Sequence, residues 1–235
     1  KPISLVFAGQ YSAGKSTILN ALTGISSIAT GEKITTQESQ VYQWTGISVI
    51  DTPGIHTTLR PDHDDISYRT ISNADMLVYV ITHELFDSYI GQNFRKLLLE
   101  KDKAGEMILI VNKMADVGNT RENQLIKLEN LKIVTDPYSP EQLRTCFVDA
   151  ESYLDSLTEN DIEIAEELRN RSNYEGLVST INDFVKERSI SSRLTTALYK
   201  IYDILQKDMI QFEPSSGDDD VDALEEHLHH ERRII

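Results

Sequence analysis

Apolar runs alternate with amphipathic segments along the first 150 residues of the chain. Residues 3–8, 76–81 and 107–111 are continuous apolar runs, which are typical of strands buried in a parallel sheet. Residues 41–44 and 47–50 flank Thr45 and Gly46, a pattern that predicts a β-hairpin. Helical spacing occurs at residues 16–22, 94–99 and 125–131, and residues 146–148 predict a weaker last strand. The order of these segments predicts an α/β fold with a mainly parallel sheet, one antiparallel edge strand and helices on both faces.

The pattern changes after Asp149, where helical periodicity replaces the apolar runs. Residues 177–185 have one apolar face, and a stripe of apolar residues at three- and four-residue steps continues from 190 to 209. Residues 214–220 form an acidic linker. We therefore predict two domains, 1–188 and 189–235, of which the second is a helical neck segment.

A phosphate-binding loop is predicted between the first strand and the first helix. Residues 9–16 match the pattern G-x-x-x-x-G-K-S/T in the strand–loop–helix context that its mechanism requires. The loop N–H groups and the helix N-terminus would point at the phosphates, and Lys15 would reach the β- and γ-phosphates as an exposed charge. The predicted phosphate-binding residues are Gly9, Gln10, Tyr11, Ser12, Ala13, Gly14, Lys15, Ser16 and Thr17.

Three further positions predict a Mg²⁺ site and a switch. The Ser16 hydroxyl would bind the metal directly, and Asp51, at the end of a strand, would hold it through water. Gly54 completes an Asp-Thr-Pro-Gly sequence whose last N–H can reach a γ-phosphate. Thr36, which we prefer to Thr35, lies in the polar loop between these motifs and would close on Mg²⁺ and the γ-phosphate.

The predicted base-reading residues follow the later strands. Asn112 and Lys113 resemble the start of the guanine-reading sequence N-K-x-D, but Ala115 stands where the aspartate belongs. The nearest carboxylate is that of Asp116, one residue later. Either Asp116 reads the base or the selectivity for guanine is weakened. Asp149 and Ala150, after the last strand, complete the predicted nucleotide-binding set.

The charge and the cysteine content limit the binding partners and the cellular compartment that we expect. The net charge of −15 opposes contact with nucleic acid or an anionic membrane, so we expect neither to bind this chain directly. Membrane contact is expected only through segments outside the chain. The single cysteine, Cys146, fits a reducing compartment and predicts a cytoplasmic protein.

The phosphate loop, together with Thr17 and residues 20–22, resembles that of dynamin-superfamily GTPases, especially bacterial dynamin-like proteins. The resemblance implies GTP hydrolysis with Mg²⁺, and a K⁺ or Na⁺ ion bound with the help of Ser12. Ser12, Lys15 and Thr36 would then be the catalytic residues. It also implies a homodimer that forms across the nucleotide, a helical bundle that moves with nucleotide state, and membrane remodelling by the full-length protein.

Other functions remain open at this point. Tyr11 and Ala115 allow an ATPase of the same fold, because the sequence around Tyr11 resembles the ATP-using EH-domain relatives of dynamin. Ile55 cannot orient a water molecule, and this allows an interaction module with negligible turnover. An apolar residue at that position also occurs in ribosome- or RNA-associated GTPases, which form the third alternative.

Overall fold

The computed structural model describes residues 4–25, 39–52, 70–71, 74–86, 88–100 and 103–211. Six strands form one sheet in the order β2-β3-β1-β4-β5-β6. β2 pairs antiparallel with β3 at one edge, and the other recorded pairs are parallel. This confirms the predicted fold class. The strands are β1 (Ser4–Gly9), β2 (Gln40–Trp44), β3 (Ile47–Asp51), β4 (Met76–Thr82), β5 (Met107–Asn112) and β6 (Cys146–Phe147).

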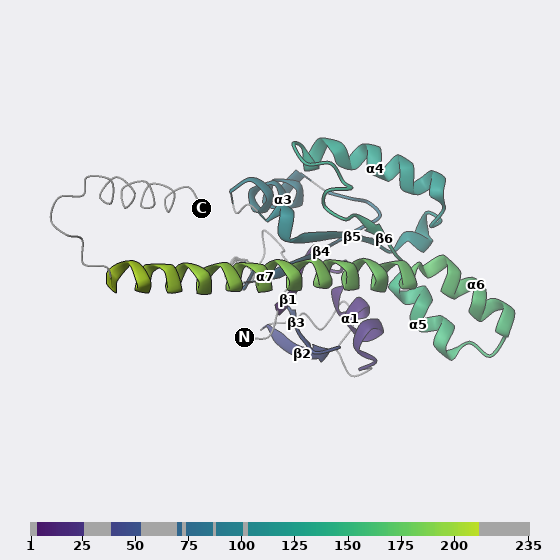
Figure 1. Ribbon diagram of the computed structural model, residues 1–235. Helices are drawn as coiled ribbons and strands as arrows, with labels where there is room; N and C mark the ends of the chain where they lie inside the picture. Colours follow the sequence, from purple (N-terminus) through teal and green to yellow (C-terminus); the bar gives the residue numbers. More distant parts are fainter. Residues whose placement is uncertain are drawn as a thin grey trace. The chain divides into compact units, whose positions relative to one another are not determined.

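Helices cover both faces of this sheet, with α3 and α4 on one side and α1 on the other (Figure 1). Two short 3-10 helices, η1 and η2, flank β5. The helices are α1 (Lys15–Thr23), α3 (Ser88–Glu100), η1 (Ala104–Glu106), η2 (Met114–Asp116), α4 (Arg121–Thr135), α5 (Ala150–Thr158), α6 (Ile162–Ser172) and α7 (Tyr174–Gln211).

Alternate residues of the central strands enter two separate cores. In β1, Leu5 and Phe7 pack with α1 and the first turns of α7, whereas Val6 and Ala8 pack with α3 and α4. All four side chains are fully buried. Because both faces of the sheet are covered, its central strands are continuous apolar runs in the sequence.

The carboxyl ends of the parallel strands lie at one edge of the sheet. Gly9, Asp51, Thr82 and Asn112 are the last residues of β1, β3, β4 and β5. Open α/β sheets bind ligands at this edge, because the loops that follow the strands converge there. The fold therefore brings the motif residues together although they lie up to about 100 residues apart.

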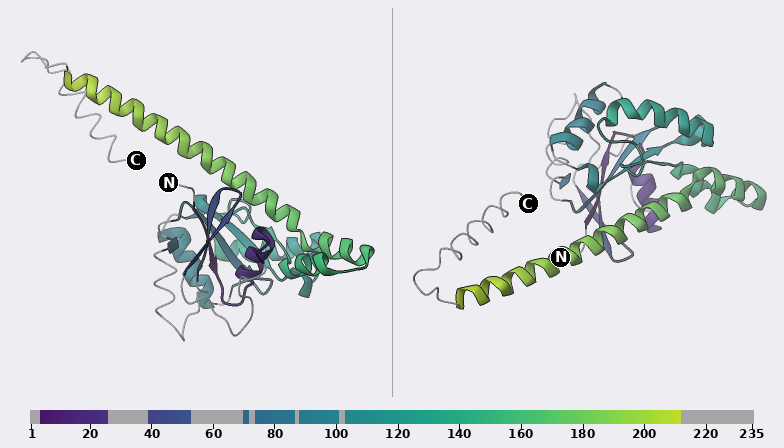
Figure 2. Two further views of the ribbon diagram at one scale, coloured as in Figure 1. Left: turned by 90° about the horizontal axis from the view of Figure 1, so that it is seen from below. Right: turned by 45° about the horizontal axis from the view of Figure 1, so that its top comes forward.

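Two helices, α5 and α6, were not predicted from the sequence. They lie side by side as a hairpin that projects from one end of the sheet (Figure 2). Most of the α6 side chains are exposed, so this helix lacks the apolar stripe on which the prediction depended. Its detectable signal is the N-cap: the Asp161 carboxylate accepts hydrogen bonds from the backbone N–H groups of Glu163 and Ile164.

The first turns of α7 pack against the sheet domain. The Tyr174 hydroxyl donates to the Ala21 carbonyl of α1 at 2.8 Å, and its ring stacks on Tyr153 with centroids 3.6 Å apart. Leu177 and Phe184, on the same helix, are about 1% exposed. This part of α7 therefore belongs to the core of the sheet domain.

The chain divides into two compact units, Lys1–Val185 and Lys186–Ile235, and the boundary falls within α7. That the second unit serves as a neck segment remains a prediction. The predicted acidic linker at 214–220 lies outside the described residues. In the described part of the chain, no helix combines the length and apolarity needed to cross a bilayer.

We expect Phe184→Ala to lower the free energy of unfolding by about 3–5 kcal/mol, because it removes a buried ring from a closed core. The ring also has the Arg144 guanidinium 4.6 Å from its centroid. Urea denaturation followed by circular dichroism measures the change. Ile162→Ala, at a side chain that is 82% exposed, is the control and should change stability by less than about 0.5 kcal/mol. Equal effects of the two substitutions would contradict the packing of α7 described above.

Candidate nucleotide site

The loop from Gly9 to Ser16 joins β1 to α1, and two close contacts require its glycines. A Cβ atom on Gly9 would lie 2.1 Å from the Val80 carbonyl oxygen, and one on Gly14 would lie 2.4 Å from Nδ2 of Asn112. Both residues have positive φ angles, 130° and 87°. Ser12 is also in the left-handed region, with φ 56°. The backbone path of the loop thus depends on glycine at its first and sixth positions.

Lys15 is buried, which corrects the prediction of an exposed charge. Its side chain lies under the loop, where the ammonium donates to the carbonyl oxygens of Gln10 at 2.9 Å and Gly9 at 3.4 Å. Burial lowers the pKa of Lys15 from 10.5 to about 8, and the negative charge of Asp51 opposes this shift. Two backbone carbonyls of the loop therefore hold the ammonium in place.

Ser16 and Asp51, two of the predicted metal ligands, are in contact. The Ser16 hydroxyl donates to Oδ2 of Asp51 at 3.1 Å, and Asp51 is 1% exposed. A hydroxyl and a carboxylate are hard oxygen donors of the kind that Mg²⁺ prefers, so this pair fits the predicted ion. Two other predicted residues, Thr36 and Gly54, lie outside the described residues.

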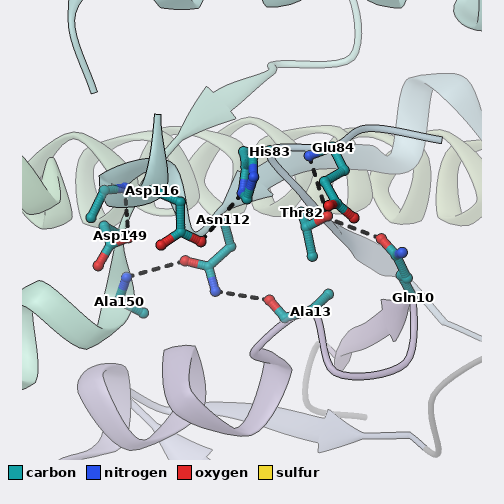
Figure 3. Close-up of polar contacts among 10 residues, drawn as sticks. Gln10, Ala13, Thr82, His83, Glu84, Asn112, Asp116, Asp149 and Ala150 are labelled. Atoms are coloured by element: carbon teal, nitrogen blue, oxygen red, sulfur yellow. Dashed lines mark hydrogen bonds and ion pairs between the residues drawn. The ribbon is translucent and has the colours of Figure 1, made fainter. Parts of the chain in front are cut away.

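Asn112 connects the phosphate loop to the loops that follow β5 and β6. Its Nδ2 donates to the Ala13 carbonyl at 2.8 Å, and its Oδ1 accepts from the Ala150 N–H at 3.1 Å (Figure 3). The side chain is 2% exposed. The structure thus brings Ala13, Asn112 and Ala150 together, as the sequence predicted for one nucleotide site.

Two carboxylates flank the loop that contains Ala115. The Asp149 carboxylate accepts from the Ala115 N–H at 2.8 Å and from the Ser152 N–H at 2.8 Å. The Asp116 side chain is 63% exposed, and its Oδ2 lies 3.5 Å from Nδ1 of His83 (Figure 3). Both predicted carboxylates are therefore present, but in different environments.

Two further residues at this edge, Thr82 and His83, were not predicted from the sequence. The Thr82 N–H donates to Oε1 of Gln10 at 3.3 Å, which ties the end of β4 to the phosphate loop. His83 follows directly and faces Asp116. A polar pair after a buried strand was the available signal, because strand ends meet at one edge of a parallel sheet.

The comparisons with known proteins agree with this geometry. The family model described as "50S ribosome-binding GTPase" matches residues 4–113. The tRNA modification GTPase MnmE of Chlorobium phaeovibrioides is 31% identical over 119 residues, which cover 47% of this chain and 25% of that protein. A structure of an Aquifex aeolicus Era variant bound to GDP.AlF4- superimposes with a TM-score of 0.56 at 20% identity, over 77% of this chain and 56% of that one.

Residues 4–113 resemble a GTPase family, and the six-stranded sheet with its phosphate loop has the fold of P-loop GTPases. The matched family and the curated relatives are described as GTPases. The chain spans about a quarter of the length of the curated relatives that it matches. A bacterial dynamin GTPase, LeoA from ETEC, shares the fold with a TM-score of 0.50 at 23% identity, over 89% of this chain and 44% of that one. The dynamin-like assignment itself is not established by this likeness in fold, and membrane remodelling has no support from the comparisons.

We expect nucleotide binding to take up protons near pH 8. The pKa of Lys15 is about 8 in the described structure, and nearby phosphate charge would raise it. The protonated lysine then binds better, so affinity should fall as the pH rises through 8. Calorimetric titration of GDP with Mg²⁺ at pH 8, in two buffers of different ionisation enthalpy, should show uptake of about half a proton per nucleotide.

At pH 7, where Lys15 is mostly protonated before binding, the uptake should be much smaller. Equal affinity from pH 7 to pH 9.5, with no proton uptake at pH 8, would contradict the assignment of Lys15 to the phosphates.

Proposed function

We propose that this domain is a GTP-hydrolysing switch that acts in an RNA- or ribosome-linked process. The observation that carries the proposal is its 31% identity to a tRNA modification GTPase over 119 residues. The family model that matches residues 4–113 is also described by ribosome binding. These likenesses oppose the expectation, based on charge alone, that the protein has no link to nucleic acid.

The charge still constrains how such a link is made. A chain with a net charge of −15 is repelled by phosphate backbones, so a broad contact between this domain and RNA is unfavourable. We therefore propose that RNA or ribosome is held through other surfaces of the protein. The domain would supply the nucleotide-dependent step.

The residues of the site have distinct parts in hydrolysis. Lys15 would hold the β- and γ-phosphates, while Ser16 and Asp51 would hold Mg²⁺. A Mg²⁺ ion bound there would offset the negative charge of the phosphates. Thr36 and Gly54 are proposed to sense the γ-phosphate. Since phosphoryl transfer needs little covalent chemistry from the protein, positioning and charge are what these residues contribute.

A dynamin-like GTPase head is the second candidate. The likeness in fold to the bacterial dynamin LeoA extends over 89% of this chain, against 77% for the Era structure. In this function the domain would dimerise across the nucleotide and move the helices that follow it. The second candidate function differs from the first in its partner, which would be a membrane.

We expect GTP turnover by the protein with Mg²⁺ to rise severalfold with tRNA or ribosomes and to stay unchanged with anionic vesicles. Lys15→Ala should lower turnover under every condition by about 100-fold or more, because charge-assisted hydrogen bonds to phosphate are lost. Phosphate release measures the rates. Stimulation by vesicles alone would favour the dynamin-like function, and unchanged turnover in Lys15→Ala would remove the assignment of the site.

We also expect turnover to depend on K⁺ or Na⁺ and on protein concentration. Ser12 lies in the phosphate loop, and we propose that it helps to bind a monovalent cation that stabilises charge in the transition state. Replacing K⁺ and Na⁺ by choline should lower turnover about tenfold or more. Turnover per molecule should rise with concentration if homodimers close the site.

Ser12→Ala is the matched variant for the cation effect. It should abolish the difference between K⁺ and choline while GDP affinity stays nearly the same, since the loop backbone and Lys15 hold the phosphates. If GTP turnover per molecule changes with neither the monovalent cation nor the protein concentration, this part of the proposal is wrong.

A further inference from the structure

Position 115 lacks the group on which guanine reading depends. A site that selects guanine needs an acceptor for the hydrogens on N1 and N2 of the base, and a carboxylate provides two such oxygens. Ala115 has no polar side chain, although it follows Asn112 at the spacing of the N-K-x-D aspartate. A carboxylate from elsewhere must serve if the base is read in this way.

The Asp149 carboxylate lies against the backbone of that same position. Its Oδ2 accepts the Ala115 N–H at 2.8 Å, so it occupies the space next to the missing side chain. The adjacent residue, Ala150, is bound to Asn112, which is bound to the phosphate loop. The carboxylate is thus held in the network that connects the loops of the nucleotide site.

Asp149 is the N-cap of α5 and is buried, so its carboxylate needs hydrogen-bond donors. The residue is 5% exposed, and among the described residues no basic side chain forms an ion pair with it. A buried carboxylate is destabilising unless it is well compensated. Two backbone N–H groups use about half of its roughly four acceptor positions. The remaining capacity matches the two donors of guanine.

Asp116, the residue that the sequence suggested, is less suited to this task. Its side chain is 63% exposed and is directed to His83 on the loop after β4. An exposed carboxylate exchanges a hydrogen bond to water for one to the base, with little net gain in binding free energy. A desolvated carboxylate discriminates strongly between bases that can and cannot donate to it. Asp116 also lacks the two backbone donors that fix Asp149 in one orientation.

We propose that Asp149 reads the N1 and N2 hydrogens of guanine in place of the carboxylate that Ala115 does not provide. The assignment rests on the proposed binding of guanine nucleotides. It makes Asp149 the specificity-determining residue of the site and gives Asp116 no direct part in base selection. Adenine would be rejected because it presents an acceptor at N1 to the same carboxylate.

Calorimetric titration of GDP, xanthosine diphosphate and ADP, with Mg²⁺, tests the assignment in three proteins: the unmodified chain, Asp149→Asn and Asp116→Asn. The carboxamide of Asp149→Asn has one acceptor and one donor group, which match N1–H and the 2-oxygen of xanthine, whereas guanine needs acceptors for both N1–H and its 2-amino group. We expect Asp149→Asn to lower the affinity for GDP about 10- to 100-fold and to raise the affinity for xanthosine diphosphate. The protein would then prefer xanthosine diphosphate to GDP. Asn is a good N-cap, so α5 should remain folded.

Asp116→Asn is the matched control and should keep the preference for GDP. Reversal of the preference in Asp116→Asn would overturn the assignment, as would equal weakening of both nucleotides in Asp149→Asn. Should Asp149→Asn fail to fold, Asp116→Ala decides: retained GDP selectivity over ADP supports Asp149, and its loss overturns the proposal. If the unmodified chain binds no GDP, the proposed function itself fails. The two failures are therefore distinguishable.

Discussion

The carboxamide of Asn112 bonds to two segments that the sequence separates widely. It donates to Ala13 in the phosphate loop and accepts from Ala150 at the start of α5. The approach is so close that only glycine fits at position 14, where a Cβ would lie 2.4 Å from the amide nitrogen. One buried side chain therefore connects the phosphate loop to the start of α5. Such a polar group is stable only when both ends are satisfied.

The charges of the site are arranged for a ligand that brings its own negative charge. Lys15 is buried among backbone carbonyls with a lowered pKa, in a chain whose net charge is −15. A phosphate at the loop would relieve the cost of burying that ammonium. Ligands that bind only the folded state stabilise it, so nucleotide should protect this domain against unfolding. In the proposed function, nucleotide binding and folding would be coupled through the buried ammonium of Lys15.

Fold and motif leave the biological partner undetermined, because many functions share this architecture. The phosphate loop resembles that of dynamin-like proteins, yet the curated relatives that match are tRNA modification GTPases. The loop performs the same task in both groups, which is to hold phosphates with backbone N–H groups. Residues with a common task do not distinguish the groups.

The sequence by itself determined the α/β fold with one antiparallel edge strand and the place of the phosphate loop, and it named Ser16 and Asp51 as members of one site. Those features arise from local patterns: apolar runs, a glycine-rich turn and a polar residue at a strand end. It did not predict α5, a helix of nine residues, or α6, whose side chains are mostly exposed and whose signal is the Asp161 cap. Only the tertiary structure decided that Lys15 is buried and that the Asp149 carboxylate accepts the Ala115 N–H. The physical reason is that both depend on contacts between loops brought together at one edge of a parallel sheet, and no local pattern encodes such a contact.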